Sequence, residues 1–201
     1  MTAQDLFRCI GNLSDTMIEE AADIRRKKRW LPIAALAACA VAWKFGISGE
    51  TAAAALAEFH GAGRRLEYKG SFHGADVYDD YAHHPNELHA LLQAVRLMHY
   101  RRVICAFQPH TYSRTKALFQ SFVDELRTAD QVVLADIYAA REQNTVGVSS
   151  QELAAEIPGA VYCPSLQGVT AYLRENAQPG DIILTVGAGD IYKAGEALFT
   201  E

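Results

Sequence analysis

The sequence predicts an α/β fold with three layers, in which a mostly parallel sheet carries helices on both faces and follows a helical amino-terminal extension. After Gly63, short β-prone runs alternate with amphipathic helical runs. That alternation is typical of a parallel sheet whose crossover helices cover both faces. The longer β-prone runs are Val103–Phe107, Gln131–Ala135 and Asp181–Val186, and the shorter ones are Leu66–Tyr68, Ala75–Tyr78 and Ala160–Tyr162.

The residues before this alternation predict helices. Apolar residues recur at helical spacing within residues 1–30, and an Ala-rich helical run covers residues 31–45. Ser48 is a typical helix cap, and it precedes a second helical run over Ala52–His60. We therefore expect a helical hairpin with no sheet of its own and a domain boundary near Gly61–Arg64.

Apolar faces at helical spacing are expected between the strands. Residues three or four positions apart lie on one face of a helix, and such a face packs on the sheet. One face consists of Leu88, Leu91, Leu92, Val95 and Met98, another of Leu118, Phe119, Phe122 and Leu126, and a last helix is expected near Ile191–Leu198.

Composition excludes several classes of protein. The chain has 201 residues, half of them hydrophobic and 21% charged, which is enough for a packed core. Lys and Arg number 19 against 24 Asp and Glu, so no overall positive field exists to hold nucleic acid. The four cysteines lie far apart without a CxxC pair, which argues against a disulfide scaffold or a structural zinc site and favours a cytoplasmic protein.

A basic run, Arg25–Arg29, leads into the apolar stretch Leu31–Trp43. A spanning helix needs about 20 apolar residues, and this stretch is shorter. A signal peptide has a similar order of charges, but an acidic segment of 24 residues precedes the basic run here. We expect a buried helix with a solvated basic end, and export or membrane anchoring is the less favoured alternative.

Polar side chains gather where the predicted strands end, which is where parallel sheets bind their ligands. The first cluster, Asp79–Glu87, holds carboxylates and imidazoles before a helix in which Pro85 fits the first position. Carboxylates can hold a ribose hydroxyl or a magnesium ion, and imidazoles at a helix start suit phosphate. The alternative is a polar capping turn in which Asp80 is a structural hydrogen-bond acceptor.

The second cluster, Gln108–Lys116, has the composition of an anion site. It carries a histidine, three hydroxyl side chains and two cations at a strand-to-helix turn. Arg114 can grip a carboxylate or a phosphate through two parallel hydrogen bonds, so we expect an anion between Arg114 and the backbone of His110–Ser113. Cations are unfavourable at the positive end of a helix, which favours this reading over a plain exposed helix start.

Two further clusters are weaker signals. Asp136–Asn144 is explained equally well by a solvated loop with an Arg–Glu pair. Gly187–Asp190 lies between a strand and a helix, but Tyr192 stands where a dinucleotide fingerprint has its third glycine, so tight packing of a turn is the favoured role. The sequence has no GxxxxGK[ST] phosphate loop and no GxSxG or HExxH motif.

Together the clusters resemble the carboxyl-terminal domain of the Mur ligases, in particular the members that join L-alanine to UDP-N-acetylmuramate in peptidoglycan synthesis. The strings that carry the resemblance occur in the family's order and are Asp79–Pro85, Gln108–Thr115, Asp136–Glu142 and Gly187–Ile191. The resemblance implies that residues 64–201 are a Rossmann-like carboxyl-terminal domain. It also implies that residues 31–63 are a helical remnant of the central domain and that residues 1–30 match nothing in the family.

The resemblance also implies the chemistry of the complete enzyme. ATP, with Mg²⁺, phosphorylates the muramate carboxylate, and the amino group of L-alanine attacks the acyl phosphate. The carboxyl-terminal domain closes over the central domain to complete the site. Because this chain lacks a UDP-binding domain and nearly all of the central one, the resemblance implies that it is inactive by itself.

Site residues follow from the same resemblance. His110 and Arg114 resemble the catalytic groups that face the acyl phosphate and the alanine carboxylate. The residues expected to bind substrate or ATP are Asp80 at the ribose, His83 near the phosphates, Tyr81 beside the amino acid, and Arg64 and Arg65 in the hinge motif. None is expected to ligate a metal.

Two other classes of function stay open on the sequence. One is a non-catalytic module that binds a nucleotide or an amino acid. The other is a membrane-tethered fusion product, because Asp15–Ala21 and the basic run resemble the cytoplasmic start of a small membrane-anchored protein. The sequence thus suggests a fusion, a gene fragment or an assembly artefact.

Overall fold

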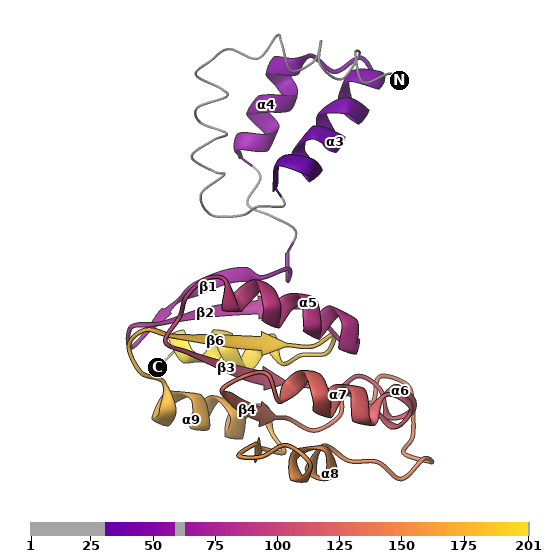
Figure 1. Cartoon of the computed structure of the whole chain (residues 1–201), viewed down its shortest axis with the longest axis vertical. Helices are drawn as coiled ribbons and strands as arrows, with labels where there is room; N and C mark the ends of the chain where they lie inside the picture. The colour runs from indigo at the N-terminus through magenta and orange to yellow at the C-terminus, as the bar shows by residue number, and fades with distance from the viewer. Residues whose placement is uncertain (1–30, 59–62, 201) are drawn as a thin grey trace. The chain divides into compact units, whose positions relative to one another are not determined.

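The computed structural model describes residues 31–58 and 63–200, and the helix expected within residues 1–30 lies outside these ranges. Contacts divide the chain into two compact units, residues 1–60 and residues 61–201, and each has its own architecture (Figure 1).

The described part of the first unit consists of two helices, α3 (Leu31–Lys44) and α4 (Gly49–Ala57). Ser48 caps α4, and its hydroxyl accepts a hydrogen bond from the backbone N–H of Thr51 at 3.2 Å. The two helices predicted after residue 30 are confirmed, although α4 begins three residues before Ala52. Within the described residues, no helix combines the length and the apolar character that crossing a membrane requires.

The second unit contains one six-stranded sheet with the order β1-β2-β6-β3-β4-β5. The edge strand β1 is antiparallel to β2, and all other neighbours are parallel. This sheet confirms the predicted fold class. The strands are β1 (Glu67–Phe72), β2 (Ala75–Asp80), β3 (Arg102–Phe107), β4 (Gln131–Leu134), β5 (Val161–Tyr162) and β6 (Asp181–Val186).

The edge strand β1 is longer than the sequence predicted, because it continues past Tyr68 to Phe72. The extra residues include Lys69 and Gly70, which are poor strand formers. A tight turn at His73 and Gly74, both with positive φ, folds β1 back onto β2. Pairing along this hairpin therefore overrides the weak local preference.

Helices cover both faces of the sheet (Figure 1). The first face carries α5 (Pro85–Arg96), α7 (Phe119–Leu126) and α8 (Ser150–Ala155), and the second carries α9 (Leu166–Asn176), α10 (Tyr192–Glu196) and the 3₁₀ helix η1 (Ala197–Phe199). Alternate strand residues point to opposite faces, so β3 sends Phe107 into the first apolar layer and Ile104 into the second.

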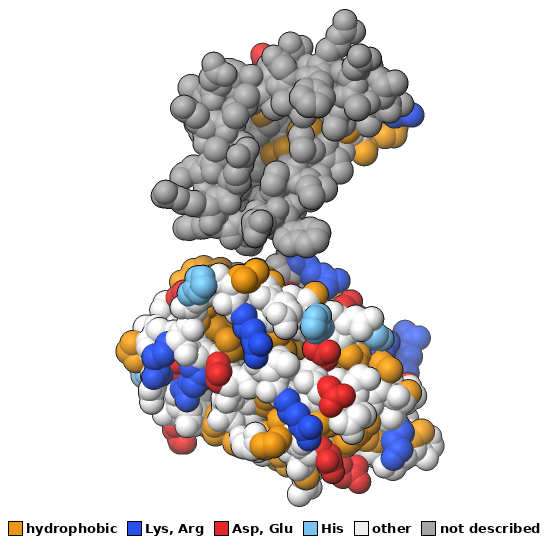
Figure 2. Space-filling model, in the orientation of Figure 1, with side chains coloured by type: hydrophobic (Ala, Val, Ile, Leu, Met, Phe, Trp, Pro, Cys, Tyr) orange, Lys and Arg blue, Asp and Glu red, His pale blue; other side chains and the backbone are white. Residues whose placement is uncertain are grey.

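The predicted helix faces are largely correct. Most of their residues are buried, and Leu118 and Phe119 are half-buried. Met98 was predicted wrongly, because α5 ends at Arg96 and Met98 lies beyond it with 36% of its surface exposed. On the face of the second unit that Figure 2 shows, acidic and basic side chains are interspersed, in keeping with the net charge of −5.

Strand register brings the carboxyl ends of four strands together, and we call this end of the sheet its carboxyl edge. Asp80 at the end of β2 pairs with Val186 of β6, which pairs with Phe107 of β3, which in turn pairs with Leu134 of β4. The segments that follow these strands therefore begin side by side. This edge holds all four polar clusters that the sequence singled out.

At the amino ends of the parallel strands, Asp181 begins β6, and its carboxylate is fully buried. It accepts hydrogen bonds from the Nη2 atoms of Arg101 at 2.9 Å and Arg102 at 2.7 Å, and from the backbone N–H of Gln178 at 3.0 Å. Burial would raise the pKa of Asp181, but these hydrogen bonds outweigh it and hold the pKa below its ordinary value of 3.8.

We expect Asp181→Asn to lower the free energy of unfolding by about 1.5–3 kcal/mol at neutral pH, the scale of charge-assisted hydrogen bonds. Because the folded-state pKa is lowered, this stabilisation is present above the unfolded-state pKa and is lost as pH falls through the folded-state pKa. Urea titrations at neutral and acidic pH should therefore show that the difference in unfolding free energy between the wild type and Asp181→Asn shrinks in acid. Asp124→Asn, at an exposed carboxylate that accepts only from Gln120, is the control. A difference that does not depend on pH would contradict the prediction.

Candidate functional site

Four rings form a row across the carboxyl ends of β2, β3 and β4. Successive ring centroids lie 5.4 Å apart for Tyr81 and His83, 6.1 Å for His83 and His110, and 5.6 Å for His110 and Tyr138. The two tyrosines are 37% and 38% exposed, so the row is open to solvent. The structure thus joins Tyr81, His83 and His110, which the sequence placed in two clusters, and adds Tyr138 from a third.

The helix start after β2 confirms the predicted cap. Pro85 is the first residue of α5, and Nδ1 of His84 accepts a hydrogen bond from the backbone N–H of Asn86 at 3.2 Å. Oε2 of Glu87 accepts from the backbone N–H groups of His83 at 2.9 Å and His84 at 3.2 Å. The backbone N–H groups that precede this helix start are therefore bonded to the Glu87 side chain.

The surroundings of His83 fix where its proton sits. Nδ1 lies 3.0 Å from the carbonyl oxygen of Tyr81 and 3.4 Å from Oε2 of Glu87. A carbonyl oxygen can only accept a hydrogen bond, so Nδ1 carries the proton. In the neutral ring the lone pair is then on Nε2, which makes this nitrogen a proton acceptor.

His110 has the opposite arrangement. Nη1 of Arg114 donates to the carbonyl oxygen of His110 at 3.0 Å and approaches its Nδ1 at 3.4 Å. A guanidinium can only donate, so Nδ1 accepts and the proton of the neutral ring sits on Nε2. Burial lowers the pKa of His110, and the positive charge of Arg114 lowers it further. At neutral pH His110 is therefore an uncharged hydrogen-bond donor.

Glu142 occupies the turn where the sequence predicted an external anion. Its carboxylate accepts hydrogen bonds from the hydroxyl of Thr111 at 2.8 Å, the backbone N–H of Ser113 at 2.9 Å and the hydroxyl of Ser113 at 2.5 Å. The hydrogen bonds from Ser113 lower the pKa of Glu142. Sequence reasoning offered an Arg141–Glu142 pair for this loop, whereas Glu142 bonds a turn 29 residues before it.

Asp80 is 7% exposed, and both of its oxygens are engaged by the backbone. Oδ2 accepts from the N–H of Leu66 at 2.7 Å and Oδ1 from the N–H of Ala82 at 2.8 Å. Burial raises the pKa of Asp80, and these two hydrogen bonds oppose the rise. Asp80 is thus a structural acceptor here, and its contact with a ribose stays a prediction.

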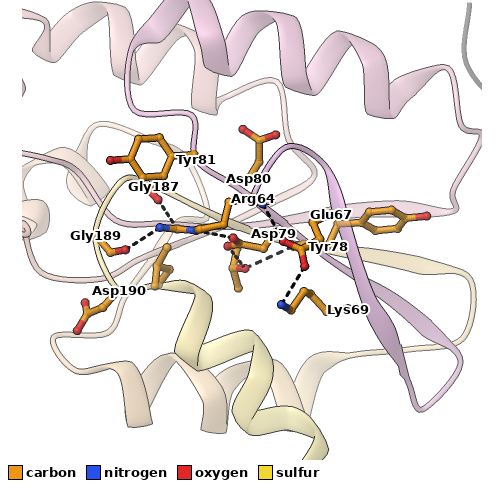
Figure 3. Close-up of polar contacts among 12 residues, drawn as sticks. Arg64, Glu67, Lys69, Tyr78, Asp79, Asp80, Tyr81, Gly187, Gly189 and Asp190 are labelled. Atoms are coloured by element: carbon orange, nitrogen blue, oxygen red, sulfur yellow. Dashed lines mark hydrogen bonds and ion pairs between the residues drawn. The ribbon is translucent and has the colours of Figure 1, made fainter. Parts of the chain in front are cut away.

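The neighbouring carboxylate, Asp79, forms an ion pair that sequence reasoning missed (Figure 3). Nε of Arg64 lies 2.7 Å from Oδ2 of Asp79, and the hydroxyl of Thr185 donates to Oδ1 at 2.8 Å. Figure 3 also shows the Arg64 side chain reaching the turn at Gly187 and Gly189, whose carbonyl oxygens accept from it at 2.6 and 3.1 Å. The sequence held one signal for this ion pair, namely an aspartate at the end of a buried strand and an arginine at the predicted domain boundary.

The turn over Gly187–Asp190 confirms the predicted role in tight packing. A Cβ at Gly187 would come within 2.7 Å of the carbonyl oxygen of Gln108, and one at Gly189 would come within 2.7 Å of Cγ of Tyr138. Oε1 of Gln108 accepts from the N–H of Asp190 at 2.9 Å. The residues that follow β3 and β4, Gln108 and Tyr138, therefore pack directly against this turn.

Arg65 differs from its neighbour because it is exposed, with its guanidinium carbon 5.8 Å from the ring centre of Tyr81. The residues present do not suit a magnesium ion. Asp79 and Asp80 are bound to Arg64, Thr185 and backbone N–H groups, and the described residues contain no cluster of three His, Cys, Asp or Glu placed to hold a metal.

Comparison with known proteins gives consistent matches. A family model described as Mur ligase, glutamate ligase domain matches residues 64–189. A UDP-N-acetylmuramate--L-alanine ligase of Caldanaerobacter subterraneus subsp. tengcongensis is 45% identical over 83% of this chain and 37% of its own length. Another, from Lachnospira eligens, is 48% identical over 81% of this chain and 36% of its own length. The chain thus spans little more than a third of these relatives.

Solved structures resemble it as well. A UDP-N-acetylmuramate-alanine ligase from Thermotoga maritima has a TM-score of 0.63 and 26% identity, covering 82% of this chain and 35% of that one. A murein peptide ligase from Psychrobacter arcticus has a TM-score of 0.54 and 25% identity, covering 83% and 35%.

We expect His110 to titrate below its ordinary pKa of 6.5, and Arg114→Gln to raise that midpoint because it removes a neighbouring positive charge. Imidazole resonances followed by NMR against pH measure both values. Arg127→Gln is the control, since Arg127 binds the carbonyl of Glu156 and contacts none of the four rings. An unchanged midpoint in Arg114→Gln would refute this account of His110.

The turn at Thr111–Ser113 should lose order in acid. Because the pKa of Glu142 is lowered, its hydrogen bonds stabilise the turn above the ordinary value of 4.5 and are lost as pH falls through the folded-state pKa. Hydrogen exchange at the Ser113 amide, corrected for the intrinsic pH effect, should show this loss in the wild type. Glu142→Gln should show fast exchange at all pH values, and Glu156→Gln should behave as the wild type. A Ser113 amide that Glu142→Gln leaves protected would contradict the assignment.

Proposed function

The chain belongs to the Mur ligase family, with the glutamate ligase domain over residues 64–189, and we propose that it is the carboxyl-terminal part of an ATP-dependent ligase that joins L-alanine to UDP-N-acetylmuramate. The relatives at 45% and 48% identity carry the name of this reaction, which supports both substrates. The single observation that carries the proposal is the meeting of His83, His110 and Arg114 at the carboxyl edge of the sheet.

In the proposed reaction, the amino nitrogen of L-alanine attacks an acyl phosphate formed from the muramate carboxylate and ATP. A C–N bond forms, the C–O bond to the phosphoryl group breaks, and phosphate leaves. The alanine ammonium must lose a proton before it attacks, and Nε2 of His83 holds the lone pair that accepts it.

His110 and Arg114 handle the negative charge in this proposal. His110 donates its Nε2–H to an oxygen of the acyl phosphate, where charge grows during the attack. Arg114 is its immediate neighbour and binds the alanine carboxylate with its remaining N–H groups. Tyr81, exposed at the end of the ring row, lines the space for the amino acid.

ATP contacts are proposed for Arg65 and Asp80. Arg65 is exposed beside Tyr81, so its charge is available to phosphate. A carboxylate has about four lone-pair sites, so Asp80 can accept from a ribose hydroxyl in addition to its two backbone donors. Mg²⁺ would accompany ATP on groups outside the described residues.

The sequence holds no phosphate loop, so the cradle for the transferred phosphoryl group must come from other ligase domains. Electrostatic stabilisation of that group supplies most of the catalysis of phosphoryl transfer. We therefore propose that this chain does not ligate L-alanine by itself and that the other ligase domains are its partners. Since the reaction consumes ATP, we propose that it takes place in the cytoplasm.

A chimaera tests the proposal. Residues 64–200 of this chain would replace only the residues aligned with them in the Caldanaerobacter ligase, and UDP-N-acetylmuramoyl-L-alanine would be measured for the chimaera and for the chain alone. We expect product from the chimaera only. A chimaera that binds ATP or L-alanine without making product would favour a non-catalytic binding module instead, and product from the chain alone would overturn the proposed dependence on other domains.

In that chimaera, Arg114→Lys keeps the charge but loses the two-pronged contact. We expect a loss of about 1.5–3 kcal/mol in transition-state binding, which is about 10–200-fold in kcat/KM for L-alanine. Arg127→Lys, remote from the ring row, is the matched control. Wild-type kinetics in Arg114→Lys would mean that the wrong cation has been assigned.

A further inference from the structure

Arg64 uses its side chain within the protein. Nε binds Asp79 at 2.7 Å, and the two Nη atoms donate to the carbonyl oxygens of Gly187 at 2.6 Å and Gly189 at 3.1 Å. Its guanidinium carbon lies 5.0 Å from the ring centre of Tyr81 and 4.8 Å from that of Tyr192. Only 24% of the side chain is exposed. All three nitrogens are thus engaged in a partly desolvated setting, where such contacts are strong.

The backbone of Arg64 is held as well. Its carbonyl oxygen accepts from the N–H of Tyr81 at 2.8 Å, and its own N–H donates to Oε2 of Glu67 at 2.7 Å. The residue has φ of 56°, an uncommon value for a side chain other than glycine. A strained backbone that persists is over-determined by its surroundings, and here the surroundings are the end of β2 and the first ring of the row.

The contacts of Arg64 extend to the other side of the site through the turn. Gly187 and Gly189 accept from Arg64, and Gly189 packs without space against Tyr138. Tyr138 in turn stacks on His110. Arg64 therefore affects both ends of the ring row, Tyr81 directly and Tyr138 through the glycine turn, and Tyr138 passes this support to His110.

We propose that Arg64 is a positioning residue and that it does not contact ATP or substrate. Its side chain holds the start of the second unit against Asp79 and the Gly187–Asp190 turn, and we call these contacts the clasp. Arg65, exposed and next to Tyr81, is the one of the two arginines that faces a ligand. The role of the positioned rings rests on the proposed function, whereas the clasp itself rests only on the contacts of Arg64.

Hydrogen exchange and fluorine NMR on the full 201-residue chain test the clasp. In Arg64→Lys, one ammonium replaces three directed contacts, so exchange at the amides of Gly187, Asp190 and Ile191 should rise by about tenfold or more. With 3-fluorotyrosine incorporated, the resonances of Tyr81 and Tyr192 should move, and Tyr→Phe variants assign them. Amides within β3 should exchange as in the wild type.

Arg174→Lys is the matched control, because Arg174 also donates to two backbone carbonyls, those of Ala197 and Thr200, and lies 6.0 Å from the ring centre of Phe72. It should speed exchange near residues 197–200 and leave the turn and both fluorotyrosine resonances unchanged. Arg64→Ala should exceed the effect of Arg64→Lys, and if it fails to fold, Arg64→Lys decides alone.

Two results would overturn the proposal. One is that Arg64→Lys has the same amide exchange and the same fluorotyrosine resonances as the wild type, and the other is that its exchange rises as much in β3 as in the glycine turn. In the chimaera, Arg64→Lys should lower kcat/KM for L-alanine about tenfold or more, in parallel with exchange at the turn. If the wild-type chimaera makes no product, the proposed function fails, and the exchange and fluorine results still decide the role of Arg64.

Discussion

Two adjacent buried carboxylates at the end of β2 constrain everything around the candidate site. Successive side chains of a strand point to opposite faces, so Asp79 and Asp80 cannot share one counter-charge. Asp79 is paired with the charge of Arg64, and Asp80 accepts hydrogen bonds from the backbone N–H groups of Leu66 and Ala82. An unpaired buried charge costs several kcal/mol, so residues 64–66 must lie along the strand end, even with positive φ at Arg64 and Leu66.

At the same edge of the sheet, His83 and His110 hold their protons at different ring nitrogens. His83 directs Nδ1–H at a carbonyl and keeps a lone pair on Nε2, while His110 accepts from Arg114 and keeps a proton on Nε2. Their ring centroids are 6.1 Å apart, so a proton acceptor and a hydrogen-bond donor lie side by side. Burial and the charge of Arg114 lower the pKa of His110 and keep it neutral, and they outweigh the opposing effect of the Glu142 carboxylate.

The sequence predicted what depends on local patterns. Short β-prone runs located the strands, and the Pro85 and Ser48 signals located two helix starts, because these patterns act over a few residues. It missed the side-chain partners of Arg64, which lie 15 to 125 residues away in the chain. It also missed the partners of Glu142, which lie 29 to 31 residues away. Those partners depend on strand register, which no local pattern encodes. The family resemblance supplied residue types for the site but not their partners.

The close approach of Gly189 to Tyr138 matters for any attempt to reshape the space beside the ring row. Tyr138 and the glycine turn are one packed unit, so a smaller side chain at position 138 opens a void beside Gly189 rather than a clean pocket beside His110. Directed evolution that varies position 138 alone would therefore sample mostly loosened sites. Libraries that vary positions 108, 138 and 189 together respect the packing, and they are where a reshaped site should be sought.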